Sequence, residues 1–325
     1  MATLLTIGCI ISNGSGRVVF TSERDGHTEV YSVEASGEDP QRLTNSVASE
    51  SVPSWSPDRK QIAFLSYDGA GQHLWLMDAE GEGERLAVSA EGNMVDFDWA
   101  PDSQRIAYVA TSDGTMDVWM VDLERNELIR VTNGEGDEQL GGWSPNGEWL
   151  VFYATDSDSE PGLWLRNPSG VNLIRLTQGV DTDAVWSPDG EMIAFVRTQD
   201  DNVDIYVLAK TDSGNWREGV QEVRLTQIAE QDISPSWSPD SRTLAFVSYR
   251  DGNPEIYTMR ADGARQHRLT NNGHEDLEPV WSPDGQKIAF VSYAFGAGEI
   301  FVTNFDGSDQ QRLTNNNAEE NSPDW

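Results

Sequence analysis

Tryptophan recurs along this chain at a nearly constant interval. Successive members of the series are separated by 44, 44, 43, 51, 44 and 44 residues. The series consists of Trp55, Trp99, Trp143, Trp186, Trp237, Trp281 and Trp325. Self-similarity at such a period marks a repeat architecture, so the repeat unit decides what the chain can fold into. A length of 325 residues fits one large domain of this kind as well as two or three unrelated domains.

Each unit has the same internal order, which the segment after Trp281 illustrates. A turn follows at Ser282-Pro283-Asp284-Gly285, where proline suits the second turn position. The apolar run Ile288-Ala289-Phe290 then predicts a buried strand. A loop leads to a third strand with an aromatic residue at Phe301, and a fourth strand ends at Leu313-Thr314. Four antiparallel strands per unit are therefore expected.

These units predict an all-β, seven-bladed β-propeller. An isolated four-stranded sheet cannot bury both faces, and radial stacking buries them while leaving only short edges exposed. The chain starts with strands two to four of a unit in residues 17–45 and finishes with a first strand in residues 321–325, so pairing of the two terminal segments should close the ring. Residues 10–14 are an alternative for that inner position. The expected division is an N-terminal segment, 1–16, that is a strand or the remnant of a longer N-terminus, and a propeller, 17–325.

The repeated Trp-Ser-Pro-Asp-Gly, Ile-Ala-Phe, Ile-Tyr and Leu-Thr motifs resemble the TolB-like (WD-type, PD-repeat) β-propeller family over residues 17–325. TolB itself would imply six blades behind a small α/β domain, so seven units indicate a family member other than TolB. The resemblance also implies a periplasmic or extracellular location. Cys9 is the only cysteine, so it does not identify the compartment, and its lipidation in a longer precursor is left open.

The charge balance limits the possible partners. Asp and Glu total 55 against 22 Lys and Arg, a net charge of −33. Such a chain repels phosphate backbones and anionic lipid, so we expect no nucleic-acid binding. The apolar N-terminal run is too short to span a bilayer, so no direct membrane insertion is expected. A monomer that attracts cations or basic peptides fits this composition, as does an acidity that serves only solubility.

Six of the seven units carry a carboxylate five residues before the tryptophan, and we call these the connector acids. They are Glu50, Glu138, Asp181, Asp232, Asp276 and Glu320. Pseudo-symmetry would gather them around the mouth of the central channel, which predicts a site for a protein or basic peptide. Clustered carboxylates also recruit Ca²⁺, so Asp181, Asp183, Asp232 and Asp276 are candidate metal ligands, although no cofactor is required. The structural alternative is that each carboxylate caps backbone N–H groups of its connector.

A second acid recurs two residues before the aromatic residue of the third strand, and we call this set the strand acids. They are Glu29, Asp117, Asp204, Glu255 and Glu299. Repetition in five blades indicates a structural role, namely bonding to the neighbouring loop. Trp216 lies in the extra length of the one long unit and is expected to pack on its own blade edge.

No catalytic motif stands out, since the four histidines form no metal-binding pair and no nucleophile elbow or phosphate-binding loop is present. The sequence therefore predicts a protein that is not an enzyme, has no catalytic residues, and binds a protein or peptide at the acidic channel face. Two alternatives stay open: the propeller of a carbohydrate-active or peptidase-type enzyme whose substrate enters the channel, and a ligand-free scaffold. A pocket with two carboxylates and aromatic walls would favour the enzyme, and a bare symmetric acid ring the binding module.

Overall fold

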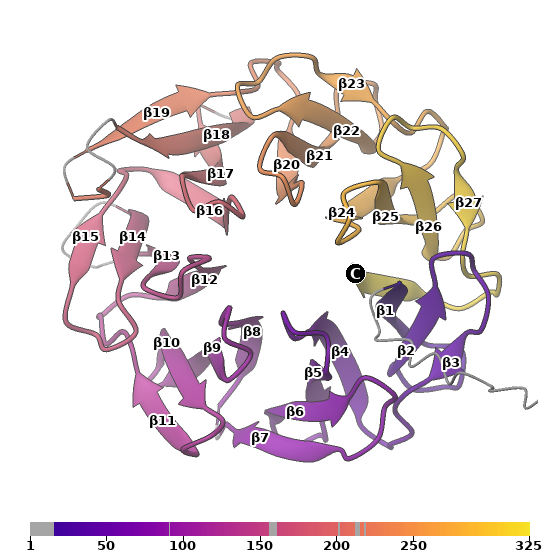
Figure 1. The fold of residues 1–325 in the computed structure, drawn as a ribbon, viewed down its shortest axis with the longest axis horizontal. Helices are drawn as coiled ribbons and strands as arrows, with labels where there is room; N and C mark the ends of the chain where they lie inside the picture. Colours follow the sequence, from indigo (N-terminus) through magenta and orange to yellow (C-terminus); the bar gives the residue numbers. More distant parts are fainter. Residues whose placement is uncertain (1–15, 91, 156–160, 201, 212–214, 218) are drawn as a thin grey trace, which may run out of the picture.

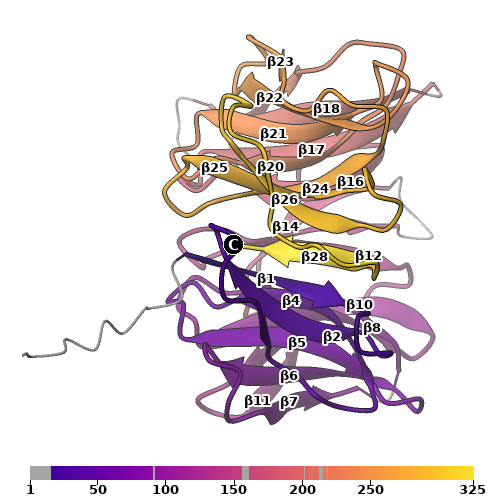
Figure 2. The same ribbon diagram turned by 90° about the vertical axis from the view of Figure 1, so that its right-hand side faces the viewer.

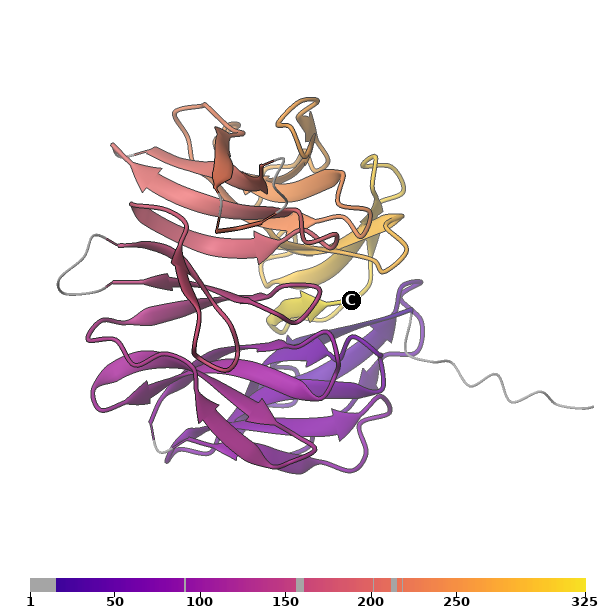
Figure 3. The ribbon, with the colours of Figure 1, turned by 60° about the vertical axis from the view of Figure 1, so that its left-hand side comes forward.

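The computed structural model describes residues 16–325 except 91, 156–160, 201, 212–214 and 218. The described residues contain 28 strands in seven four-stranded antiparallel sheets and no helix. The sheets stand radially around a central axis, one beside the next (Figure 1). The side views in Figures 2 and 3 show that neighbouring sheets pack face to face. The predicted seven-bladed, all-β propeller is confirmed.

Each blade runs outward from the axis. The innermost strands are β28 (Glu320–Asp324), β4 (Ser49–Trp55), β8 (Met94–Trp99), β12 (Glu138–Trp143), β16 (Val180–Trp186), β20 (Asp232–Trp237) and β24 (Asp276–Trp281). The second strands are β1 (Arg17–Ser22), β5 (Gln61–Tyr67), β9 (Arg105–Ser112), β13 (Leu150–Ala154), β17 (Met192–Gln199), β21 (Thr243–Ser248) and β25 (Lys287–Ser292).

The outer half of each blade holds the third and fourth strands. The third strands are β2 (Glu29–Glu34), β6 (Gln72–Asp78), β10 (Thr115–Asp122), β14 (Gly162–Arg166), β18 (Asn202–Lys210), β22 (Glu255–Arg260) and β26 (Glu299–Asn304). The outermost strands are β3 (Gln41–Arg42), β7 (Arg85–Ser89), β11 (Glu127–Arg130), β15 (Leu173–Arg175), β19 (Val220–Arg224), β23 (His267–Arg268) and β27 (Gln311–Arg312). Short outer strands leave little unpaired edge for another chain to join.

The two ends of the propeller meet in one blade. Strand β28 pairs antiparallel with β1, with Glu320 opposite Ser22 and Asp324 opposite Val19. The C-terminal segment therefore supplies the innermost strand of the N-terminal blade, as predicted. Residues 10–14 and Cys9 lie outside the described residues.

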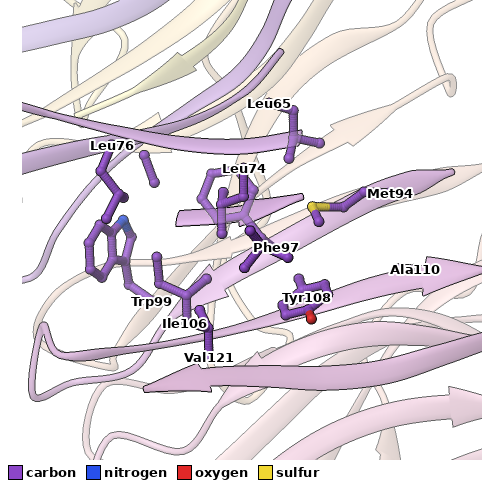
Figure 4. Close-up of a cluster of buried hydrophobic side chains, with 12 residues drawn as sticks. Leu65, Leu74, Leu76, Met94, Phe97, Trp99, Ile106, Tyr108, Ala110 and Val121 are labelled. Carbon is purple, nitrogen blue, oxygen red and sulfur yellow. The ribbon is translucent and has the colours of Figure 1, made fainter. Parts of the chain in front are cut away.

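The hydrophobic core is divided among the seven junctions between neighbouring blades. Each buried cluster combines side chains from two adjacent sheets. In the junction drawn in Figure 4, Leu65 and Leu74 of one blade pack against Phe97, Ile106 and Tyr108 of the next. Both faces of every blade are thus covered, which is why the isolated sheet is not a stable unit.

The innermost strands share a distortion close to the axis. Five of them have a residue with positive φ three positions before the blade tryptophan: Val52, Asp183, Ser234, Glu278 and Ser322. The strand register shifts at the same place, so this is a β-bulge. Exposed side chains on these strands, among them Asp183 and Glu278, form a solvent-facing surface that we call the inner wall.

Candidate functional site

The connector acids begin the innermost strands, but their side chains are buried. The exposed fraction is 2 % for Glu50, 4 % for Glu138 and 0 % for the other four. In these positions their carboxylate groups are not accessible to a partner at the channel mouth. Their part in partner binding therefore stays a prediction.

Three connector acids are neutralised by an arginine of the same blade. Arg197 donates to both carboxylate oxygens of Asp181 at 2.6 and 2.8 Å. Arg250 does the same to Asp232 at 3.1 and 3.2 Å. In the closing blade, Arg24 reaches both oxygens of Glu320 at 2.9 Å. Because each arginine bonds both carboxylate oxygens, it holds the end of the second strand against the start of the innermost strand.

The other three connector acids have polar partners without a positive charge. Ser46 donates to Glu50 at 2.7 Å, Thr132 to Glu138 at 3.3 Å, and the amide of Asn272 to Asp276 at 2.6 Å. Burial raises the pKa of Glu50 and Asp276, and burial with the charge of nearby Asp117 raises the pKa of Glu138 to about 7.

Three of the five strand acids bond to the connector loop that follows their blade, as predicted for the whole set. Glu29 accepts hydrogen bonds from Arg42 at 2.6 Å and from the backbone N–H of Ser46 at 3.1 Å. Glu255 and Glu299 accept the equivalent N–H groups, each at 3.0 Å. All five strand acids are 0 to 3 % exposed, and each pairs with an arginine on the outermost strand of its blade. Each pair links the third strand to the fourth.

The candidate metal ligands are not brought together. Asp181 and Asp232 are each held by an arginine in their own blade, whereas Asp183 is exposed on the inner wall. Across the described part of the chain, no three histidine, cysteine or acidic side chains form a group that could hold a metal ion.

The inner wall carries a different set of acids, which we call the wall acids: Asp96, Asp98, Asp183, Glu278 and Asp324. They stand one or three residues before a blade tryptophan. Several bond to the next blade: Asp98 accepts the N–H of Trp143 at 2.8 Å, and Asp324 accepts the N–H of Trp55 at 2.7 Å. Among these acids the sequence predicted only Asp183, as a candidate metal ligand. Counting back one and three residues from each tryptophan would have found the others.

No wall acid forms a salt bridge within the described ranges. Desolvation raises the pKa of Asp96 to about 6, and desolvation together with the charges of Asp96 and Asp324 raises that of Asp98 to about 7. The pKa values of Asp183, Glu278 and Asp324 are raised as well, in each case mainly by desolvation. Asp96, Asp98, Asp183 and Glu278 therefore lack a counter-charge among the described residues, whereas the charge of Arg59 partly offsets the raised pKa of Asp324.

Two wall acids border a pocket of about 260 Å³ between three innermost strands, which we call the wall pocket. Asp96 comes from β8, and Asp183 and Thr182 come from β16. Tyr153 and Gln139 of the blade between them add to the polar lining. The middle strand has Gly141 here, and a Cβ atom at this position would lie 2.8 Å from the carbonyl oxygen of Ala184. Glycine thus lets neighbouring strands approach closely at the pocket.

These features define a class of protein: a seven-bladed β-propeller domain with an acidic inner wall. The family model described as the TolB beta propeller domain matches residues 68–229 and 218–325. The chain belongs to the TolB β-propeller domain family.

Curated relatives align only in part. The Tol-Pal system protein TolB of Syntrophus aciditrophicus is 56 % identical over 32 residues, which are 10 % of this chain and 7 % of that protein. TolB of Desulfosudis oleivorans is 37 % identical over 60 residues, which are 18 % of this chain and 14 % of that protein. The alignments thus span far less than two thirds of either relative.

Solved structures resemble nearly the whole chain. TolB from Acinetobacter baumannii has a TM-score of 0.61 and 19 % identity, with 96 % of this chain and 67 % of that chain covered. An oligogalacturonate lyase in complex with manganese has a TM-score of 0.70 and 16 % identity, with 90 and 86 % covered. Pyrococcus horikoshii acylaminoacyl peptidase has a TM-score of 0.66 and 16 % identity, with 92 and 50 % covered. At these identities the likeness shows the fold alone.

The comparisons contradict the prediction that the protein is not an enzyme. A lyase and a peptidase share its architecture over at least 90 % of the chain. The prediction rested on the absence of histidine and nucleophile motifs. One fold can carry several unrelated activities, so the absence of these motifs does not exclude an enzyme. The wall pocket also brings together two carboxylates and a tyrosine from three different blades.

Proposed function

We propose that this propeller binds a protein or peptide partner by accepting its cationic groups on the inner wall. The supporting observation is a contrast between two sets of carboxylates. All five strand acids have an arginine, whereas the wall acids have no salt bridge within the described residues and have raised pKa values. A lysine, arginine or terminal amine of a partner would supply the missing charge.

The proposal also includes the location of the protein and the kind of partner it meets. Family resemblance supports a periplasmic or extracellular location, and the part of the chain that the structure describes contains no helix able to cross a membrane. A net charge of −33 favours basic partners over nucleic acid, and it speeds their approach at low salt.

The test is a titration of a fluorescently labelled lysine- and arginine-rich decapeptide, followed by anisotropy. Binding should tighten between pH 5 and pH 8, because Asp96 and Asp98, with pKa values of about 6 and 7, become ionised in that range. Asp96→Asn with Asp183→Asn should weaken binding at pH 8 at least tenfold. A parallel titration of the EDTA-stripped protein with Ca²⁺ tests the predicted cation site.

A matched control separates the wall from general charge. Glu80→Gln with Glu124→Gln removes the same two charges from exposed turns between third and fourth strands. This control should bind like the wild type. Equal weakening in both double variants, or binding that does not depend on pH, would contradict the proposal.

The wall pocket also supports a second candidate, acid–base catalysis on a peptide or oligosaccharide that enters the channel. Its basis is Asp96, whose pKa of about 6 suits a proton-transfer group near neutral pH, in one pocket with Asp183 and Tyr153. Incubation with peptide and oligosaccharide mixtures, with products followed by mass spectrometry, tests it. Turnover should be lost in Asp96→Asn and persist in Glu80→Gln.

A further inference from the structure

A second pocket, of about 490 Å³, lies on the face opposite the connectors, between the blades of β12–β15 and β16–β19. We call it the tryptophan pocket because Trp149, Trp186 and Trp216 line it. Its volume is within the range of about 300 to 1,000 Å³ that is usual for small-molecule sites. None of the connector acids or wall acids belongs to it.

Two of its three tryptophans are not part of the repeat. Trp186 belongs to the periodic series, and its counterparts pack at every blade junction. Trp149 stands where the other blades have glutamine, arginine, methionine, threonine or lysine. Trp216 belongs to the extra length of the long unit. Packing of the blades alone therefore does not account for this concentration of indoles.

The molecule contains an internal comparison for this pocket. The equivalent position between the blades of β20–β23 and β24–β27 is a pocket of about 400 Å³. There Thr243 replaces Trp149, and Phe305 takes the place of Lys210 beside the periodic Trp281. The junction geometry is thus common to both sites, while the added indoles are specific to one.

The tryptophans are held in fixed positions. Trp216 is 6 % exposed and meets Trp186 edge-on, with ring centroids 5.1 Å apart. This confirms that Trp216 packs on its own blade. Lys210 lies 5.6 Å from the ring centre of Trp216 and pairs with Glu191 at 3.1 Å. Arg217 lies 5.8 Å from the ring centre of Trp149. Trp149 and Trp186 remain partly exposed, so each provides part of a preformed flat surface.

The polar residues of the tryptophan pocket indicate which kind of ligand it can bind. Amides come from Asn146 and Asn215, and carboxylates from Glu148, Asp189 and Glu191. Carboxylates accept hydrogen bonds, amides both donate and accept, and the hydroxyl groups of a sugar can satisfy both. The three carboxylates outnumber the two cations, Lys210 and Arg217, so the charge of the pocket disfavours an anionic ligand. We propose that the tryptophan pocket binds a neutral oligosaccharide, with a sugar ring against Trp149 and hydroxyl groups bonded to the surrounding amides and carboxylates.

Intrinsic tryptophan fluorescence and calorimetry test this assignment. The probes are hexamers of glucose (α- and β-linked), xylose, mannose and N-acetylglucosamine, with trigalacturonate as the anionic comparison. At least one neutral hexamer should bind saturably and shift the tryptophan emission, and trigalacturonate should not. Trp149→Ala should weaken binding at least tenfold. Asn146 lies on an exposed turn, and Asn146→Ala should weaken sugar binding several-fold. This variant tests the proposal if Trp149→Ala does not fold.

Phe305→Ala provides the matched control, because it alters the equivalent pocket at another junction. It should leave sugar binding unchanged, as should Asp96→Asn in the wall pocket. The assignment is overturned if no neutral hexamer binds, or if binding survives both Trp149→Ala and Asn146→Ala in folded protein. Binding of a proline-rich peptide at this pocket in place of any sugar would overturn it as well.

Discussion

Removal of Arg197 should destabilise the propeller by leaving a buried charge without its partner. Asp181 is 0 % exposed and receives two hydrogen bonds from this arginine, whose side chain is 10 % exposed. Arg197 also pairs with Glu222 at 2.6 Å and lies 4.9 Å from the ring centre of Tyr206. Loss of one member of a buried ion pair costs about 3 to 5 kcal/mol, and the lower end applies because Arg197 is partly exposed.

The expected shift in melting temperature follows from the size of the chain. Unfolding entropy is about 2.1 cal/mol/K per residue, or about 0.7 kcal/mol/K for 325 residues. A loss of about 3 kcal/mol in Arg197→Met therefore corresponds to a decrease of about 4 °C. Calorimetry and urea unfolding monitored by circular dichroism measure both quantities.

The double variant Arg197→Met with Asp181→Leu distinguishes the unpaired charge from lost packing. Since both ionic groups are then replaced by apolar ones, it should be more stable than Arg197→Met alone. If Arg197→Met melts like the wild type, or if the second substitution adds to the loss instead of reducing it, the reasoning is refuted.

Three further predictions concern stability. Because the pKa of Glu138 is raised to about 7 in the folded chain, folding takes up a proton between pH 5 and pH 7, so the melting temperature should fall as the pH rises through this range. Glu138→Gln should make the profile flatter, and an unchanged slope would contradict that origin. Gly142→Ala should cost about 1 to 3 kcal/mol in urea unfolding, because φ is 101° and the new Cβ would lie 2.7 Å from Asp98. Gly273→Ala, which meets nothing within 4 Å, is its control. Deletion of residues 320–325 removes β28, the strand that pairs with β1. It should abolish cooperative thermal unfolding and increase the binding of a hydrophobic dye. A sharp native-like transition would disprove the role of this strand in closure.

Local patterns were sufficient to predict the fold. The proline turns and the apolar runs each depend on a few neighbouring residues, and they recur with the tryptophan in six and seven units, respectively. The structural role of the strand acids was also accessible, because a position that recurs in five blades has the same surroundings in each. Glu29, for example, bonds to its own connector only 17 residues away.

The candidate site could be predicted only in part. The repeat placed the connector acids at the start of the innermost strands, but it did not show that Arg197, Arg250 and Arg24 would neutralise three of them. The wall acids were largely missed because their bonds join different blades: Asp98 meets Trp143, 45 residues away, and Asp324 meets Trp55, 269 residues away.

The sequence by itself determined the number of blades and the four-strand unit, since these follow from short-range periodicity. It indicated that the terminal segments close the ring, and the pairing of β28 with β1 decided which segment supplies the inner strand. Only the tertiary structure decided which carboxylates are buried with an arginine and which face the axis without one. Burial and charge pairing depend on where neighbouring blades bring distant side chains, and a repeat that places an acid at the same position in every unit does not specify that environment.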